Sequence, residues 1–261
     1  MITDEIRRDR WVSVLQALGL VVLFWWLVTG LLFGLPASSD GRRAAAIVAS
    51  LLGGSALALA ILIRQDRSPR AAWLGFLAGG TLWAWAQAAL YGGWLVGPGS
   101  SGTPIPDGRW AVALEAVRET SWSEAAALGV LLLSAALAVG ARNKVVLGTV
   151  ALLWGAHQVA RINVFLGVAN ASPGLLPDHL QFMTRFFGPP ENTPFLGVSV
   201  VFWVVTTFLL IRAGWRTQDR FTRRSAMVFG VLAGLAALEH LFLGLSARLA
   251  LWDFFLRSRS G

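Results

Sequence analysis

The stretch that decides the fold reads HQVARINVFLGV, residues 157–168, and it lies within a long apolar run. The run is long enough to cross a bilayer, yet it contains His157, Arg161 and Asn163. A charged side chain at membrane depth costs several kcal/mol unless a buried partner or a ligand offsets that cost. The segment therefore predicts the interior-facing side of a helix in a membrane bundle.

The composition of the whole chain agrees with a membrane location. The chain has 261 residues, of which 56% are hydrophobic and only 14% are charged, with a mean hydropathy of +0.62. Soluble domains carry about 25% charged residues. This length suits a single domain of about seven transmembrane helices. We therefore predict an all-α integral membrane protein in contact with the lipid bilayer.

Charge and cysteine content exclude several functional classes. The net charge of +8 does not indicate nucleic-acid binding, because the arginines form short clusters between apolar runs, as loop charges that orient helices do. The absence of cysteine excludes disulfides, cysteine-bound iron–sulfur clusters, c-type haem attachment and thiol nucleophiles. We identify no motif typical of a metal centre, so none is predicted.

Seven apolar runs are each long enough to span the membrane. We place them at about residues 11–34, 44–63, 71–96, 121–140, 144–168, 195–212 and 225–247. The first run is too long for a signal-peptide core and is read as a retained span. Lys and Arg predominate in the connections that share a side with the N-terminus, which predicts a cytoplasmic N-terminus.

Three further segments look amphipathic. Residues 109–120 and 176–187 each combine apolar and polar positions and are expected to form helices on the outer surface. In the first, we assign Glu119 to the polar face. Near the C-terminus, Leu249 to Leu256 with Trp252 is expected to lie in the membrane interface.

Several polar residues fall at a similar depth in the predicted spans. A helix rises about 1.5 Å per residue, which places the embedded polar groups of four spans about 20–25 Å from the inner membrane surface. We call these residues the polar layer: Gln87, Glu124, His157, Arg161, Asn163, Glu239 and His240. His157 and Arg161 are four residues apart and share a face. Glu239 and Glu124 are the expected counter-charges of Arg161.

Three interpretations of the polar layer remain open. It forms a structural network that fixes helix register, or it lines a site for a pigment, lipid or tetrapyrrole, or it is a proton or transport path. The candidate axial ligands of a tetrapyrrole are His240, His157 and His179. Trp83 and Trp85 are candidates to pack against a macrocycle. The pairs Gly30/Gly34, Gly75/Gly79 and Gly230/Gly234 predict close helix packing.

Taken in order, several short motifs resemble the PuhE family of photosynthetic complex assembly proteins from purple and related phototrophic bacteria. The most specific is residues 160–168, ARINVFLGV, which resembles the family's A-K-L-N-L-F-L-G-V. Further matches along the chain are FWW at 24–26, WAWAQ at 83–87, SWSE at 121–124, LLPDHL at 175–180, LEH at 238–240 and LW at 251–252. The chain departs from the family at Gln87, where the family has an acid, at Ser123, where it has histidine, and at Arg161, where it has lysine.

The resemblance implies a function as well as a fold. It implies an assembly factor or accessory subunit of the reaction centre–light-harvesting 1 complex, in the bacterial inner (intracytoplasmic) membrane. The implied partners are reaction-centre and light-harvesting 1 polypeptides, with bacteriochlorophyll as a candidate cofactor. We expect no enzymatic activity. The alternatives are a tetrapyrrole-binding membrane protein, with bacteriochlorophyll or haem, and a membrane enzyme or transporter.

Overall fold

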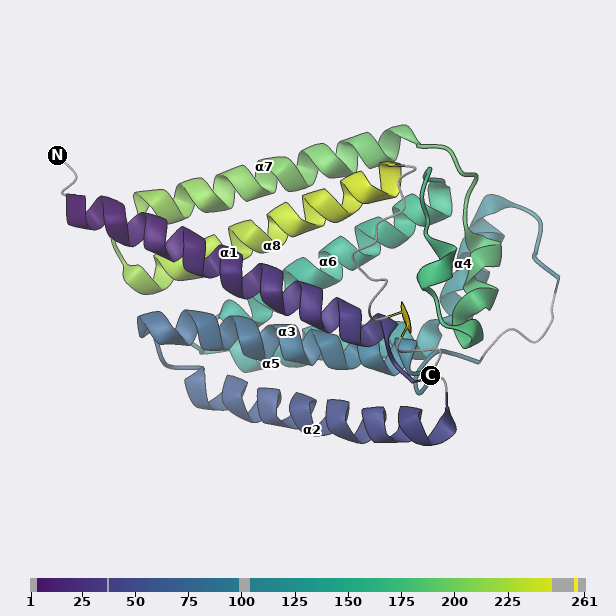
Figure 1. Ribbon diagram of the computed structural model, residues 1–261, viewed down its shortest axis with the longest axis horizontal. Helices are drawn as coiled ribbons and strands as arrows, with labels where there is room; N and C mark the ends of the chain where they lie inside the picture. The colour runs from purple at the N-terminus through teal and green to yellow at the C-terminus, as the bar shows by residue number, and fades with distance from the viewer. Residues whose placement is uncertain (1–3, 37, 99–103, 246–255, 258–261) are drawn as a thin grey trace.

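The computed structural model describes residues 4–36, 38–98, 104–245 and 256–257, and Figure 1 shows its helices packed into one bundle. In chain order the elements are α1 (Asp4–Phe33), α2 (Ser39–Ile63), α3 (Pro69–Tyr91), α4 (Arg109–Glu119), α5 (Ser121–Ala138), α6 (Val145–Leu166), η1 (Pro173–Leu175), η2 (Asp178–Phe186), α7 (Pro194–Arg216) and α8 (Arg220–Gly244). The all-α membrane fold predicted from the sequence is confirmed.

Within the part of the chain that the structure describes, seven long helices form the body of the bundle, and six of them are long and apolar enough to cross a membrane. The seventh, α3, has 23 residues and packs against α2, α5, α6, α8 and α1. Many of its buried residues are Ala or Gly, which let neighbouring backbones come close.

Glycines on α3 set its distance from α6. A Cβ atom added at Gly75 would lie 2.8 Å from Val145 Cβ, and one added at Gly79 would lie 2.9 Å from both Thr149 Cβ and the Val146 carbonyl oxygen. The predicted packing role of Gly75 and Gly79 is therefore visible in the contacts between α3 and α6. At Gly79 the obstacle includes backbone, which cannot rotate away.

Replacing Gly79 with Ala is expected to destabilise the protein by about 1–3 kcal/mol, because the added methyl group forces α3 away from α6. Gly54→Ala on α2 is the matched control, since a Cβ there meets nothing within 4 Å. Alanine at an open helical position is expected to stabilise by about 0.5–1 kcal/mol. Thermal unfolding in detergent measures both variants, and equal melting temperatures would contradict the close packing of α3 on α6.

One end of the bundle is held together by arginines. This basic end comprises the start of α1 and the connections after α2, α5 and α7. Arg223, only 3% exposed, forms an ion pair with Asp9 of α1. Arg67 Nη2 lies 2.9 Å from Asp219 Oδ2. Asp219 also accepts a hydrogen bond from the Thr222 N–H and caps α8. Hydrogen bonds from Thr222, together with Arg67, lower the pKa of Asp219.

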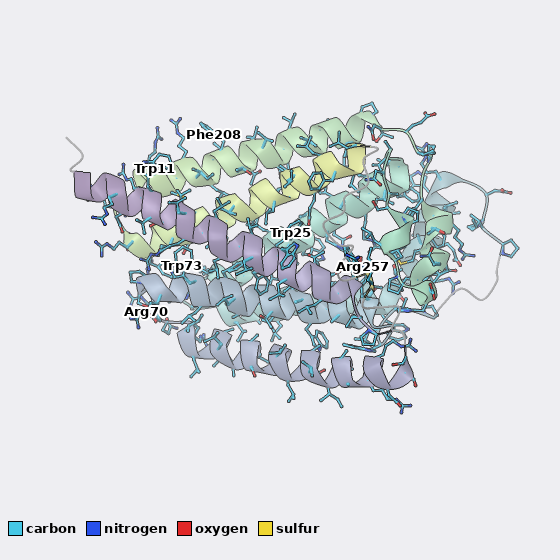
Figure 2. All side chains as sticks on the ribbon, viewed as in Figure 1. Trp11, Trp25, Arg70, Trp73, Phe208 and Arg257 are labelled. Carbon is cyan, nitrogen blue, oxygen red and sulfur yellow. The ribbon has the colours of Figure 1, made fainter. Side chains whose placement is uncertain are left out.

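Tryptophans surround the same end. Trp11 of α1 and Trp215 of α7 make an edge-to-face contact with ring centroids 5.1 Å apart, and Arg224 lies over the ring of Trp73 at 5.4 Å. Figure 2 labels Trp11, Trp73 and Arg70 at this end. Tryptophan and arginine together are typical of the membrane–water boundary. That this end faces the cytoplasm stays a prediction.

The opposite end carries a cap made of α4, η1 and η2 (Figure 1). The predicted amphipathic segments lie here, the first as the α-helix α4 and the second as the 3₁₀ helix η2. Gly167 ends α6 with a φ of 124°, a conformation that favours glycine. The Gly188 N–H then donates to the Val164 carbonyl at 2.9 Å, which folds the connection before α7 back onto the end of α6.

One sequence-based boundary needs correction. The predicted third span, 71–96, is too long, because α3 ends at Tyr91. Gly93 has a φ of 76°, and the N–H groups of Trp94 and Leu95 both donate to the Ala89 carbonyl, so the chain turns there. The predicted C-terminal interfacial segment with Trp252 lies outside the described residues, apart from Leu256.

Candidate functional site

Two cavities of about 250 Å³ each meet at the polar layer, at the cap-side half of the bundle. The first, which we call the central chamber, lies among α1, α3, α6, α7 and α8. The second, which we call the cap chamber, lies between α3, α5, α6 and the cap. Both are lined by Tyr91, His157 and Ala160. The imidazole of His157 therefore lies at the boundary between the two chambers.

The cap chamber contains an ion pair within the membrane-spanning part of the bundle. Arg161 of α6 pairs with Glu124 of α5, with the two side chains 26% and 24% exposed. Arg161 Nη2 also donates to Thr120 Oγ1 at 3.0 Å, and Gln158 Nε2 donates to Glu124 Oε2 at 2.9 Å. These partners offset the cost of a charged group at this depth.

The central chamber is largely aromatic. Trp25 Nε1 of α1 donates to Glu239 Oε1 of α8 at 2.5 Å. Trp83 of α3 meets the His157 ring edge-to-face, with ring centroids 5.5 Å apart. Gln87 also lines this chamber, and neither Gln87 nor His157 hydrogen-bonds to another described side chain or backbone group.

A third cavity, which we call the side cavity, continues from the central chamber. It has a volume of about 190 Å³. It shares Trp25, Thr29, Phe33 and Glu239 with the central chamber and extends toward the segment that follows α6. The three cavities are therefore neighbours, from beneath the cap to the space between α1 and the end of α8.

The family described as "Protein of unknown function (DUF3623)" matches residues 11–261. The chain belongs to this family. It is similar to a protein of Rhodobacter capsulatus named as an uncharacterized 30.4 kDa protein in the puhA 5′ region. The two are 27% identical over 227 residues, which cover 85% of this chain and 83% of the relative. No solved structure matches. The resemblance to the PuhE family is confirmed by these two findings.

In this DUF3623 protein, the predicted axial ligands occupy three different environments. His157 lines both chambers. His240 is fully buried, and its Nδ1 lies 2.7 Å from the Ala236 carbonyl oxygen, so that nitrogen donates and Nε2 keeps its lone pair. His240 does not line either chamber but lies beside Trp203, with ring centroids 6.2 Å apart. His179 is exposed in the cap, with its ring packed on Gly93.

Two other predicted site residues lie away from the chambers. Trp85 faces α2, with its ring 3.2 Å from the Cβ position of Gly53 and its Nε1 3.4 Å from Ser50 Oγ, so it is in no position to contact a ligand beside Trp83. Asn163 is fully buried and donates to Ser199 Oγ at 3.0 Å. That hydrogen bond joins α6 to α7, so Asn163 holds helices together.

The other members of the polar layer do line the chambers. Gln87, Glu239 and His157 line the central chamber, and Glu124, Arg161 and again His157 line the cap chamber. Arg161 takes Glu124 as its partner, whereas Glu239 bonds to Trp25 instead. Gln87 and Ser123, the two departures from the family pattern that lose an acid and a histidine, both line a chamber.

The sequence reasoning missed several residues of the site. Gln158 and Thr120 complete the hydrogen bonds of the Arg161–Glu124 pair, and Tyr91 lines both chambers. Gln158 could have been predicted, because it is a polar residue next to His157 in the apolar run at residues 157–168. Among the described residues, no three His, Asp or Glu side chains gather closely enough to hold a metal ion.

The cap is fixed by a second buried ion pair, Glu119 with Arg185 of η2. Glu119 is 0% exposed. Glu119, a polar residue of the predicted amphipathic segment, therefore points into the protein rather than to solvent. The pair joins α4 to η2, which are far apart in the sequence, and so holds the two helices together over the cap chamber.

Proposed function

We propose that this protein is a photosynthesis-related, multi-pass protein of the bacterial inner (intracytoplasmic) membrane that acts without catalysis. Its role would be that of an assembly factor or accessory subunit of the reaction centre–light-harvesting 1 complex. The observation that carries this proposal is the similarity to a protein named for the puhA 5′ region, together with the assembly role that the resemblance to the PuhE family implies. The transmembrane bundle supports it, because such a role needs contact with other membrane helices.

The outer face of α7 is the best place for such contact. α7 packs almost entirely on α8, which leaves its other side uncovered. The side chains of Val198, Phe202 and Phe208 are more than half exposed on that side, and Figure 2 shows Phe208 on the outside of the bundle. Helices of a partner protein can replace lipid on this face without exposing a polar group.

Purification from phototrophically grown cells tests the proposal. The tagged chain, expressed at its native level and extracted in a mild detergent, is expected to bring reaction-centre or light-harvesting 1 polypeptides with it. A similarly tagged, unrelated multi-pass protein from the same cells is the control for non-specific carry-over. The Phe202→Ala/Phe208→Ala variant is expected to reduce the recovery of those polypeptides, whereas Leu51→Ala/Leu62→Ala on the exposed face of α2 is not. Isolation of the chain always alone would contradict the proposal.

The tetrapyrrole alternative is favoured by one observation, the uncommitted imidazole of His157 beside Trp83. Size stands against it. Pockets for drug-sized molecules occupy about 300–1,000 Å³. A bacteriochlorophyll or haem macrocycle with its substituents is a large molecule and needs a pocket of at least that size. Each chamber, at about 250 Å³, is below this range. An absorption spectrum of the purified fraction tests the alternative, since a Soret or near-infrared band that His157→Phe removes would support it.

A further inference from the structure

The central chamber contains two polar side chains whose hydrogen-bonding capacity is unused within the described protein. Gln87 is 91% buried, with 9% of its surface exposed, and it lines the chamber. His157 faces the same space. A polar group left unsatisfied in a membrane-spanning bundle costs about 1–3 kcal/mol. Such groups therefore indicate a site where a ligand supplies the missing partners.

The positive charge nearest the chamber is already paired. Glu239 accepts a hydrogen bond from Trp25, and Arg161, on the cap-chamber side of His157, is neutralised by Glu124. An anionic ligand would therefore find no free positive charge beside the chamber, whereas Glu239 keeps its own charge because an indole N–H does not neutralise a carboxylate. The unused groups, Gln87 and His157, can both donate a hydrogen bond, so the ligand that matches them is an uncharged acceptor rather than an anion.

The donors and the walls define the shape of that ligand. The amide of Gln87 and the imidazole of His157 can each donate a hydrogen bond to a carbonyl oxygen. Phe76, Trp83 and Trp203 supply aromatic surface for a flat ring. The volume of about 250 Å³ accommodates one substituted six-membered ring.

The side cavity supplies a route for an apolar tail. It adjoins the central chamber at Trp25 and Phe33, and Leu175, Phe242 and Leu243 line its far part. A ligand with a ring in the chamber and a hydrocarbon chain along this route contacts mainly apolar side chains, with Thr29, Asn170 and Ser172 also in the lining. We propose that the central chamber binds the head group of a membrane quinone, with its carbonyl oxygens facing Gln87 and His157 and its tail along the side cavity.

Titration of the purified full-length protein with decylubiquinone tests this proposal. Quinones quench tryptophan fluorescence, and Trp25, Trp83 and Trp203 line the chamber, so binding is expected as saturable quenching. Gln87→Met and His157→Phe, which keep side-chain volume but remove the donors, are each expected to weaken binding about five- to tenfold. Trp85→Phe, on the α2 side of the same helix, is expected to leave the dissociation constant unchanged.

Thermal unfolding of each variant checks that folding is intact. Because Gln87→Met and His157→Phe remove different donors, the test remains valid if one of them fails to fold. Non-saturable quenching that is equal in wild type and variants would show partition into detergent micelles only and overturn the proposal. Displacement of decylubiquinone by low concentrations of dodecyltrimethylammonium would also overturn it, because that result indicates a cation site. None of these readouts depends on co-purification with photosynthetic polypeptides, so this inference and the proposed function fail independently.

Discussion

Replacing Arg161 with Leu is expected to destabilise the protein by about 3–5 kcal/mol and to lower its abundance in the membrane several-fold. The reason is that Glu124 would keep its charge inside the bundle with only Gln158 as a partner. Removing one partner of a buried ion pair is costly even where the pair itself contributes little net stability. Expression level and melting temperature in detergent measure the effect.

Two further variants isolate the cause. Arg118→Leu breaks an exposed ion pair within α4, with Arg118 Nη2 2.5 Å from Glu115 Oε1, and is expected to cost at most about 1 kcal/mol. The double variant Arg161→Leu/Glu124→Leu removes both charges and is expected to recover most of the stability lost by Arg161→Leu. Normal abundance of Arg161→Leu with loss of complex assembly would show that the pair serves function rather than folding.

Replacing Arg185 with Leu is expected to release the cap while leaving the helical bundle folded. Glu119, which has no exposed surface, would lose its ion-pair partner at a cost of about 3–5 kcal/mol. Because few other contacts join η2 to α4, we expect the cap to open locally while the rest of the bundle stays folded. Limited proteolysis is expected to cut between residues 169 and 193 at least tenfold faster than in the wild type.

The matched control lies at the same end of the bundle. Arg43→Leu removes an arginine that is 82% exposed and 3.8 Å from Asp40, and it is expected to leave the cleavage rate unchanged. A cleavage rate in Arg185→Leu equal to that in Arg43→Leu would contradict the role of the Glu119–Arg185 pair. Loss of the whole bundle, seen by circular dichroism, would show instead that the cap is needed for global folding.

The helices were predictable because each is a long apolar run, and lipid permits few alternatives to a helix there. The participation of Glu124 in pairing Arg161 was also predictable, since both are charged groups at a similar depth. Depth, however, fixes only the height of a residue along the bundle. It does not fix the direction in which the side chain points, so Glu239 was given Arg161 as its partner although it contacts Trp25.

The two tryptophans of α3 illustrate the same point. Trp83 and Trp85 are two residues apart, and a helix turns about 100° per residue, so they lie on nearly opposite faces. Only one of them can face a given chamber, and the structure places Trp83 there and Trp85 against α2. The burial of Glu119 could not be predicted, for a different reason. The partner that buries it is Arg185, 66 positions later in the chain, and no local pattern reports such a contact.

The contacts of the first helix have a consequence for how the protein is made. Asp9 and Trp25 of α1 bind Arg223 and Glu239 of α8, and each pair is separated by 214 residues. At synthesis rates of about 5–20 residues per second, α1 waits roughly 10–40 seconds before α8 emerges from the ribosome. During that interval the wall between α1 and α8 is missing. The central chamber is therefore the last part of the bundle to close, and a ligand too large to enter the finished protein has access to it while the chain is still being inserted.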